Sequence, residues 1–372
     1  MLIKFDIILF IYIRKINKII SMDLEIDTYS SILVDNTPEN IKKMSTKILE
    51  NQSIIFPNET IYEIGCNGLD DKAIENLYKI KHKKSESKYP ISLNCLGFYD
   101  TITLVELDEM DTKLLKNIIE NLWPGPLTIM LKANDEIIPK QLIDKDGFTC
   151  FQSPNHPIIR KIIQYSSIPI ASSGANINEK IKSTCIEHVL DHFGDIPIHI
   201  LNDNNYISTY GYETTLIKIY NHKVYILREG PIQNLKDYIK NNSICYNLVN
   251  KHKIKFKQDV YVLDILDIEL DLSQVNQSII DEYLDNAFLI DFNKLSNRYK
   301  NKFLGYVDLS INGDSNEALF NLYNVLHQIN NINCEKILIY NFSFIDNNYN
   351  KILWNILSSI ITNHIAIPLI FL

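Results

Sequence analysis

Short apolar runs alternate with amphipathic stretches through residues 22–236. Runs that are rich in β-branched residues and bounded by polar or turn-forming residues predict strands. They include SIIFP, YPISLNCL, LTIMLKA, FTCFQ, IPIASS, IPIHILND, TTLIKIY and KVYILRE. A hairpin is predicted at residues 220–223, which separate the last two runs. Between the runs, apolar residues recur at helical spacing, as at Ile41, Met44 and Ile48 after the helix start Thr37-Pro38-Glu39. This irregular alternation predicts an α/β domain with a twisted mixed sheet.

A second series of the same kind follows a break in the pattern. Residues 237–258 are polar, lysine-rich and poorly patterned, which predicts a linker. In residues 259–372 apolar runs again alternate with helical patterns, which predicts a smaller Rossmann-like βα domain with a parallel sheet. At the other end, the uncharged run in residues 1–21 extends only from Ile7 to Ile13, too short to span a bilayer. We interpret residues 1–21 as an N-terminal extension rather than a peripheral anchor, and expect no stable membrane association.

Composition and charge narrow the class of protein. Hydrophobic residues make up 46% and charged residues 22% of the chain, as in ordinary globular proteins. The formal net charge of −8 argues against a protein that binds nucleic acid mainly through bulk positive charge. The six cysteines are scattered, with no Cys-x-x-Cys pair, so neither a disulfide framework nor a zinc site is predicted. A reducing, cytoplasmic compartment fits this pattern best.

Three loops marked by glycine or proline are candidates for holding a ligand. They are Pro57-Asn58-Glu59-Thr60, Trp123-Pro124-Gly125-Pro126 and Ser172-Ser173-Gly174-Ala175-Asn176. Small residues let a ligand approach backbone N–H groups, which bind anions. A run of lysines in residues 79–88 could clamp a polyphosphate or form a solvated helix end, and each loop could equally be a structural turn. The chain contains neither a Gly-x-x-x-x-Gly-Lys nor a Gly-x-Gly-x-x-Gly motif.

No catalytic residue and no metal ligand is predicted. His188 and His192 lie four residues apart on a predicted helix and could face a metal ion. Because the sequence indicates no third ligand, we interpret them as part of a surface helix. No Ser/His/Asp or Cys/His arrangement stands out at the candidate loops.

Taken in order, the motifs resemble those of the L-threonylcarbamoyladenylate synthase family, in the type with a YrdC-like domain and an appended C-terminal domain. FPNETIYEIGCNG resembles the family's Phe-Pro-Thr-Glu-Thr-Val-Tyr-Gly-Leu-Gly, and LWPGPLTIML is nearly unchanged. FQSPNHP resembles Val-Arg-x-Pro-x-His-Pro, and SSGAN resembles Pro-Ser-Ala-Asn. YGYETT and ILREG resemble Gly-Val-Glu-Ser-Thr and Leu-Arg-Pro-Gly. The resemblance runs from about residue 22 to the end and implies a twisted mixed sheet with a basic concave face.

The resemblance also implies a reaction and its partners. L-threonine and bicarbonate would form a carbamate, whose oxygen attacks the α-phosphate of ATP and releases pyrophosphate. The product, threonylcarbamoyl-AMP, would pass to a threonylcarbamoyl-transfer complex that modifies tRNA at the adenosine next to the anticodon. ATP is thus expected as a substrate, with Mg²⁺ on its phosphates. Such chemistry depends mainly on positioning and charge neutralisation, so it does not require a nucleophilic side chain.

Site residues follow from the resemblance position by position. The residues expected to contact threonine are Thr60, Asn94, Gln152, Ser172 and Thr214. Those expected to contact the nucleotide are Lys81, Lys83, Lys88, Gly174, Asn176, Lys182 and Arg228.

Several of these positions depart from the family pattern. Gln152 stands where the family has an arginine expected to pair with the threonine carboxylate, and Glu63 stands where it has glycine. Asn94 replaces a histidine, Gly174 replaces a serine, and Lys83 replaces an arginine. Glu63 is expected either to point to solvent or to intrude on the site. Two hypotheses therefore stay open: an active synthase, or a catalytically degenerate YrdC-like module that binds nucleotide or RNA.

Overall fold

The computed structural model describes most of the chain. The described residues are 30–82, 91–177, 180–203, 208–232, 235–239, 244–248, 254, 256, 258–263, 286–295, 303–342 and 348–361. The extension predicted at residues 1–21 and the site residues Lys83 and Lys88 lie outside these ranges. No helix within the described ranges combines the length and apolarity needed to cross a bilayer.

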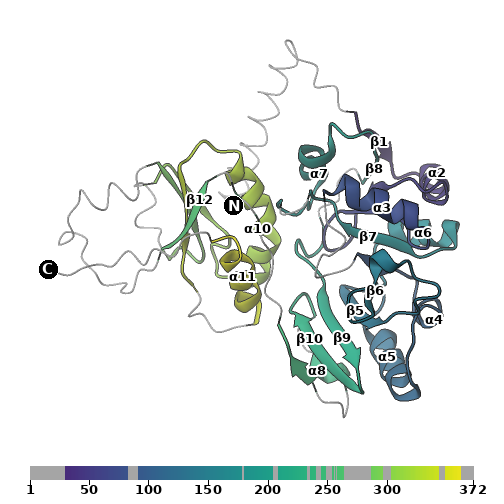
Figure 1. Cartoon of the computed structure of the whole chain (residues 1–372). Helices are drawn as coiled ribbons and strands as arrows, with labels where there is room; N and C mark the ends of the chain where they lie inside the picture. The colour runs from purple at the N-terminus through teal and green to yellow at the C-terminus, as the bar shows by residue number, and fades with distance from the viewer. Residues whose placement is uncertain are drawn as a thin grey trace.

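A large mixed sheet forms the first body (Figure 1). Its described strands are β1 (Ile32–Asp35), β2 (Ile54–Phe56), β3 (Glu63–Asn67), β4 (Ser92–Asn94), β5 (Leu127–Lys132), β6 (Phe148–Gln152), β7 (Ile170–Gly174), β8 (His199–Asn202), β9 (Thr215–Tyr220), β10 (Lys223–Arg228) and β11 (Ile244–Tyr246). Within the described residues the strand order is β1-β8-β2-β3-β7-β4-β6-β5-β9-β10-β11. Parallel and antiparallel pairs both occur, and β9 and β10 form the predicted hairpin. The mixed α/β sheet expected from the sequence is therefore confirmed.

Helices cover both faces of this sheet. They are α2 (Pro38–Leu49), α3 (Asp71–Ile80), α4 (Phe98–Ile102), α5 (Glu109–Leu122), α6 (Pro157–Ser166), α7 (Ile186–Phe193) and α8 (Leu235–Tyr238), with a 3₁₀ turn at Lys140–Leu142. Helix α2 begins where predicted, because the Thr37 side chain accepts a hydrogen bond from the Asn40 N–H. Helices α2 and α6 share one apolar core, whereas α3, α5 and α7 belong to the other. Strand β2 alternates between the two, with Ile54 and Phe56 on one side and Ile55 on the other.

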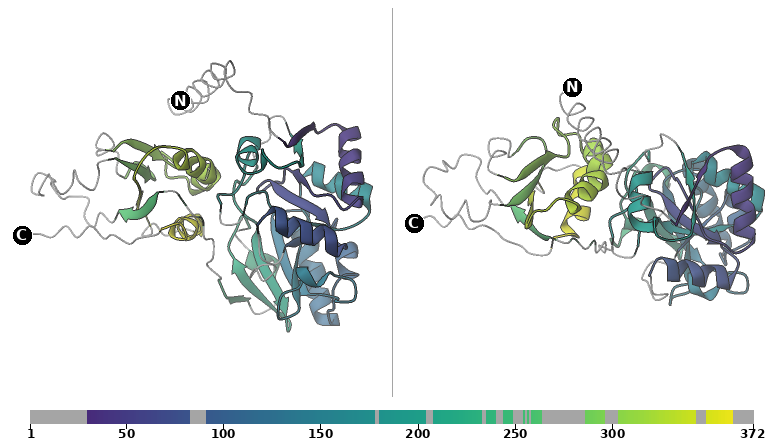
Figure 2. Two further views of the ribbon diagram at one scale, coloured as in Figure 1. Left: turned by 45° about the horizontal axis from the view of Figure 1, so that its top comes forward. Right: turned by 90° about the horizontal axis from the view of Figure 1, so that it is seen from above.

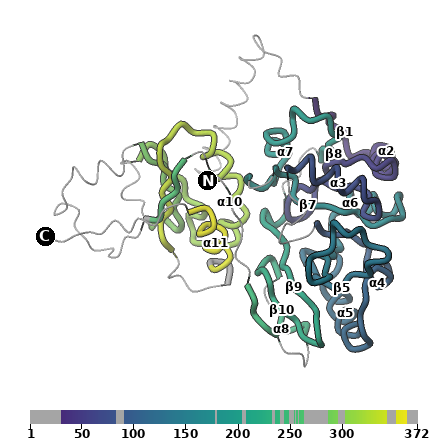
Figure 3. The backbone as a smooth tube through the Cα atoms, viewed as in Figure 1, coloured from purple at the N-terminus to yellow at the C-terminus, as the bar shows by residue number. Residues whose placement is uncertain are grey.

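The second body is smaller and wholly parallel. Its elements are β12 (Asp259–Leu263), β13 (Ala287–Asp291), β14 (Gly305–Asp308), α10 (Ser315–Asn330), β15 (Lys336–Tyr340) and α11 (Asn348–Ser358). The described strands run parallel in the order β12-β15-β13-β14, as the βα pattern predicted. Colour along the backbone shows that the two bodies follow one another in sequence (Figure 3).

Helices α10 and α11 lie on the side of the small sheet that faces the first body (Figure 2). Ile181 and Tyr212 of the first body join the apolar core of the second. The Tyr323 hydroxyl of α10 donates a hydrogen bond to Glu213 Oε2 at 2.8 Å. His327 Nε2 approaches the carbonyl oxygen of Lys182 at 3.0 Å. The two bodies are therefore in direct contact through α10 and the segments around residues 182 and 212.

The two strands at the edges of the large sheet, β1 and β11, were not predicted from the sequence. Strand β1 is an edge strand whose Ile32 and Leu33 are half exposed, so it lacks the signature of a buried run. Strand β11 lies inside the stretch 237–258 that we predicted as a linker, and it pairs in parallel with β10. Polar residues flank the three residues of β11, and a strand this short is too brief to stand out in the hydrophobic pattern of the sequence.

Candidate functional site

A row of polar side chains crosses three neighbouring strands of the large sheet. Asn94 on β4 lies directly opposite Gln152 on β6, which lies directly opposite Thr128 on β5. Directly opposed residues point to the same face of a sheet, so the three side chains meet. Gln152 Nε2 donates a hydrogen bond to Asn94 Oδ1 at 2.7 Å, and Thr128 Oγ1 donates one to Gln152 Oε1 at 3.2 Å. All three are buried.

The row continues to the hairpin through two further residues. Thr128 Oγ1 lies 2.6 Å from Thr214 Oγ1, just before β9. Arg228 on β10 donates hydrogen bonds to Thr214 from Nη2 to Oγ1 at 3.0 Å and from Nε to the carbonyl at 2.9 Å. The register of β10 shifts between Ile226 and Arg228, and such an irregularity re-aims the side chain that follows it. The cationic side chain of Arg228 is thus linked to Gln152 by successive hydrogen bonds through Thr214 and Thr128.

The chain ends at a buried carboxyl group on β3. Gln152 Nε2 lies 3.2 Å from Glu63 Oε1 and 3.3 Å from Oε2. The Ser172 hydroxyl on β7 also donates to Glu63 Oε2, and Asn94 Nδ2 in turn donates to Ser172 Oγ. Of the two orientations expected for Glu63, the structure shows the second, because its side chain points into the cluster. Glu63 and Gln152, two departures from the family motif, are therefore direct partners.

Burial sets the electrostatics of Glu63. Removal from water raises the pKa of its carboxyl group, and the hydrogen bonds from Ser172 and Gln152 oppose that rise. Gln152 and Ser172 both direct a donor at Glu63, which favours a carboxylate once the proton leaves. A ligand carboxylate beside it would meet like charge, whereas a donor or a cation would be attracted.

Lys81 joins the cluster from the end of α3. It is 3% exposed, and its ammonium group donates hydrogen bonds to the carbonyl oxygens of Gly174 and Asn176, the latter at 2.7 Å. By contrast, the Lys79 side chain is 66% exposed and pairs with Glu75 at 2.8 Å. The interpretation of the lysine run as a solvated helix end is therefore right for Lys79 and wrong for Lys81.

The loop after β7 carries the remaining nucleotide candidates. Lys182 Nζ lies 3.9 Å from Glu213 Oε1, and burial lowers the pKa of Lys182 while Glu213 opposes that shift. A Cβ atom added at Gly174 would lie 3.7 Å from Lys182 Cδ and 3.1 Å from Asn176 Oδ1. The predicted residues from 172 to 182 are thus gathered beside Lys81.

Two buried polar atoms at the predicted positions have no hydrogen-bond partner among the described residues. They are Thr60 Oγ1 and Asn176 Oδ1. An unsatisfied buried oxygen costs stability unless water or a ligand supplies the missing donor. Their presence supports the assignment of these two loops to a ligand-binding region.

The histidines of α7 correct one interpretation from the sequence. His188 is buried, and its ring stacks on that of His327 from α10 with 3.7 Å between ring centroids. His192 lies edge-on to His327 at 5.5 Å, and its Nε2 approaches the Ile181 carbonyl at 2.9 Å. Helix α7 is therefore an interface helix rather than a surface helix. The third histidine comes from a helix about 140 residues further along, which no local pattern could reveal.

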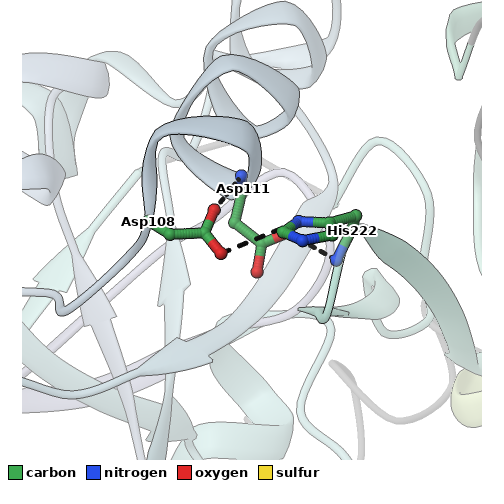
Figure 4. Close-up of side chains that lie close together, drawn as sticks. All are labelled: Asp108, Asp111 and His222. Carbon is green, nitrogen blue, oxygen red and sulfur yellow. Dashed lines mark hydrogen bonds and ion pairs between the residues drawn. The ribbon is translucent and has the colours of Figure 1, made fainter.

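A separate group of titratable residues lies at the start of α5 (Figure 4). Among the described residues, Asp108, Asp111 and His222 are the one trio of potential metal ligands whose ligand atoms lie close together. Their contacts have a structural explanation, because Asp108 caps α5 through the Asp111 N–H and Asp111 accepts the N–H of His222. None of the predicted site residues belongs to this group.

Sequence reasoning missed Thr128 and left the orientation of Glu63 open. Thr128 lies on a run that reads simply as a buried strand. Only the register of β5 against β6 places its hydroxyl beside Gln152. The sequence signal was present but weak, since a lone threonine at the start of an apolar run also suits a strand.

Comparisons with known proteins agree with this architecture. Residues 46–230 match the model of the Sua5/YciO/YrdC family, described as "Telomere recombination". The chain is 29% identical over 216 residues to a threonylcarbamoyl-AMP synthase of Pyrococcus abyssi, covering 56% of this chain and 61% of that protein. It is 27% identical over 157 residues to a threonylcarbamoyl-AMP synthase of Bacillus subtilis, covering 42% and 44% respectively. The match thus spans less than two thirds of the length of these two relatives.

A shorter relative is matched almost throughout. A Methanocaldococcus jannaschii protein, named provisionally as a threonylcarbamoyl-AMP synthase, is 31% identical over 199 residues, which are 52% of this chain and 87% of that protein. Among solved structures, P. abyssi Sua5 complexed with L-threonine superposes with a TM-score of 0.71 at 22% identity, covering 90% of this chain and 99% of that one. That likeness extends the shared fold to both bodies. The chain belongs to the Sua5/YciO/YrdC family, as do its relatives from P. abyssi and B. subtilis that are named threonylcarbamoyl-AMP synthases.

Proposed function

We propose that this chain is an L-threonylcarbamoyladenylate synthase. The observation that carries the proposal is the hydrogen-bonded cluster that runs from Arg228 to Glu63 and lies beside the loop held by Lys81. Segments far apart in the sequence supply its members, and they are the segments for which the family resemblance implies ligand contacts. The names of the relatives support the same reaction.

The proposed reaction needs two groups of residues. Lys81, Lys182 and Arg228 would neutralise the phosphates of ATP, with Mg²⁺ entering as part of the nucleotide complex. Thr60 and Thr214 would orient the amino acid through their hydroxyl groups. Threonine and bicarbonate would combine to a carbamate with release of water, the carbamate oxygen would attack the α-phosphate, and pyrophosphate would leave. Positioning and charge neutralisation would then provide most of the rate enhancement.

The product would serve tRNA modification. Threonylcarbamoyl-AMP is a reactive mixed anhydride, so a downstream transfer complex would have to take it up for delivery to the adenosine next to the anticodon. We propose tRNA and this complex as the later partners. The chain's own task would end with the adenylate.

A degenerate nucleotide- or RNA-binding module is the second candidate. The pair of Glu63 and Gln152 favours it, because the row contains a buried carboxyl group where an amino-acid carboxylate would need a cation. Losing one charged partner of a buried contact typically costs about 2–5 kcal/mol of binding. Such a loss would weaken threonine binding without preventing nucleotide binding.

Pyrophosphate release separates the two candidates. The full chain with ATP, Mg²⁺ and bicarbonate should release pyrophosphate only when L-threonine is added. Lys81→Ala should reduce this release at least roughly tenfold, because the charge beside the loop is lost. Lys79→Ala removes an exposed lysine two residues away and should leave the rate unchanged. ATP binding without threonine-dependent release, in a protein with unchanged circular dichroism, would instead establish the degenerate module.

A further inference from the structure

A cavity of about 400 Å³ lies outside the cluster described above. Its walls come from the loops at Glu59, at Pro124–Pro126, at Asn155–His156 and at Thr209–Tyr210. None of the residues expected to contact threonine or nucleotide lines it. The proposed synthase reaction therefore assigns no role to this cavity.

The Glu59 side chain is the polar feature of this cavity that lacks an explanation. It is 5% exposed, and its Oε1 accepts a hydrogen bond from the Asn155 N–H at 3.0 Å. Its other oxygen, Oε2, is buried without a hydrogen-bond partner among the described residues. Such an atom normally has a partner, so a donor from a bound molecule would satisfy it. Burial raises the pKa of Glu59 to about 7, and the nearby Glu63 carboxyl adds to that rise, whereas the backbone hydrogen bonds and Arg160 lower it.

The rest of the lining is acidic or neutral. Asp203 supplies a second carboxyl group, and the lining residues, all described, include no lysine or arginine. His156 Nδ1 accepts the Ile158 N–H, so the ring proton lies on Nε2, 3.7 Å from Asp203 Oδ2. Burial lowers the pKa of His156 to about 4, which leaves the ring neutral near pH 7.

Neighbouring elements reinforce the preference for positive charge. The cavity includes Leu122 at the C-terminal end of α5, where the helix dipole is negative. Arg160 is the cation near Glu59, and its guanidinium group is already bonded to the Pro154 carbonyl and the Ser153 hydroxyl. The lining also contains the apolar side chains of Pro124, Pro126, Pro157, Pro231 and Ile232, which suit a short apolar chain.

We propose that this cavity binds a primary ammonium group carried on a short apolar chain. The ammonium group donates to Glu59 Oε2, and the apolar part lies against the prolines of the Pro124–Pro126 corner. A free alkylamine and a lysine side chain share this chemistry.

Calorimetric titration of the full chain with n-propylamine tests the proposal. Affinity should rise about tenfold from pH 6 to pH 8, because the ionised fraction of a group with a pKa of about 7 rises about tenfold over that interval. Glu59→Gln should weaken binding at pH 8 at least tenfold and abolish the dependence on pH. Glu106→Gln, at an exposed glutamate outside the cavity, should change neither the affinity for propylamine nor its dependence on pH. The same titration with a short peptide that contains one lysine then shows whether the cavity binds a lysine side chain of a protein as well as a free alkylamine.

Several outcomes would overturn the proposal. Equal binding of the uncharged isostere 1-propanol would show that charge is not recognised, and displacement of the amine by equimolar Mg²⁺ would indicate a metal site instead. Absence of any binding would have the same effect. If Glu59→Gln does not fold, the carboxyl ¹³C signal of Glu59 in the wild-type chain decides. Its apparent pKa should fall when propylamine is added, and an unchanged value would refute the site.

Discussion

At the scale of single residues, the coupling of Glu63 to Gln152 is the most informative feature. Each departs from the family pattern, and each partners the other across the cluster. A carboxylate beside an arginine would form an ion pair, whereas a carboxylate beside a glutamine accepts an amide hydrogen. The two departures are therefore one change in the character of the site, from cationic towards acidic.

This coupling gives a prediction that rests on the proposed function. In Gln152→Arg alone, the new guanidinium group should bind the Glu63 carboxylate, so the KM for L-threonine should change less than about threefold. In Glu63→Gly with Gln152→Arg, the cation is free to bind a ligand carboxylate, and the KM should fall at least about tenfold, or about 1.4 kcal/mol. Steady-state pyrophosphate release measures both. Equal effects of the single and double variants would mean that the two residues are not coupled.

At the scale of elements, a glycine sets how closely α10 approaches the first body. Gly211 has φ +77°, and a Cβ atom added there would lie 2.8 Å from the carbonyl oxygen of Phe320 on α10. Both the left-handed backbone and the backbone contact require glycine. The space around Gly97, by contrast, is open, and its φ of 169° is extended.

We expect Gly211→Ala to loosen the contact between α10 and the first body. Strain from the positive φ and the close contact should lower the free energy of unfolding by about 1–3 kcal/mol. Amide exchange should accelerate in α10 and around residue 212. Gly97→Ala, the matched control, should leave exchange in α10 unchanged. Equal protection of α10 in the two variants would show that this contact does not hold the helix.

At the scale of the whole molecule, two buried histidines, His188 and His327, and the half-buried His192 link the two bodies. Burial lowers the pKa of His192 to about 4 and that of His327 to about 2. His188 stacks on His327, Lys81, Lys180 and Lys182 lie near His192, and Glu213 is held by α10. Because the pKa values of His192 and His327 are depressed in the folded state, the stability that these two rings contribute is present above the unfolded value of about 6.5 and is lost as the pH falls below it.

The contact between the two bodies should therefore weaken on acidification. Between pH 7 and pH 5, protection from amide exchange should fall at residues 181–184 and in α10 before it falls in the core of the large sheet. In His327→Phe, which keeps an aromatic ring but cannot be protonated, that loss should be smaller between the same pH values. A uniform loss of protection over both bodies would point to global acid unfolding instead.

The sequence predicted elements better than the ways in which they meet. A helix start is a local signal: Thr37 was predicted to begin a helix, and its side chain caps α2 in the structure. The position of β7 between β3 and β4 depends on pairing between distant segments, so the meeting of Glu63 with Gln152 could not be foreseen. Likewise, the burial of His188 depends on His327. Motif order predicted which positions gather, but not their hydrogen-bond partners.

The contacts between α10 and the loop after β7 have a consequence for protein engineering. The carbonyl oxygen of Lys182 lies within hydrogen-bond distance of His327 on α10. The ammonium group of Lys182 faces Glu213, which accepts a hydrogen bond from Tyr323 on the same helix. Chimaeras that exchange the C-terminal half with that of a relative would have to carry residues 180–184 and 208–213 along with it. Otherwise the exchanged α10 would pack against first-body residues that do not match its side chains.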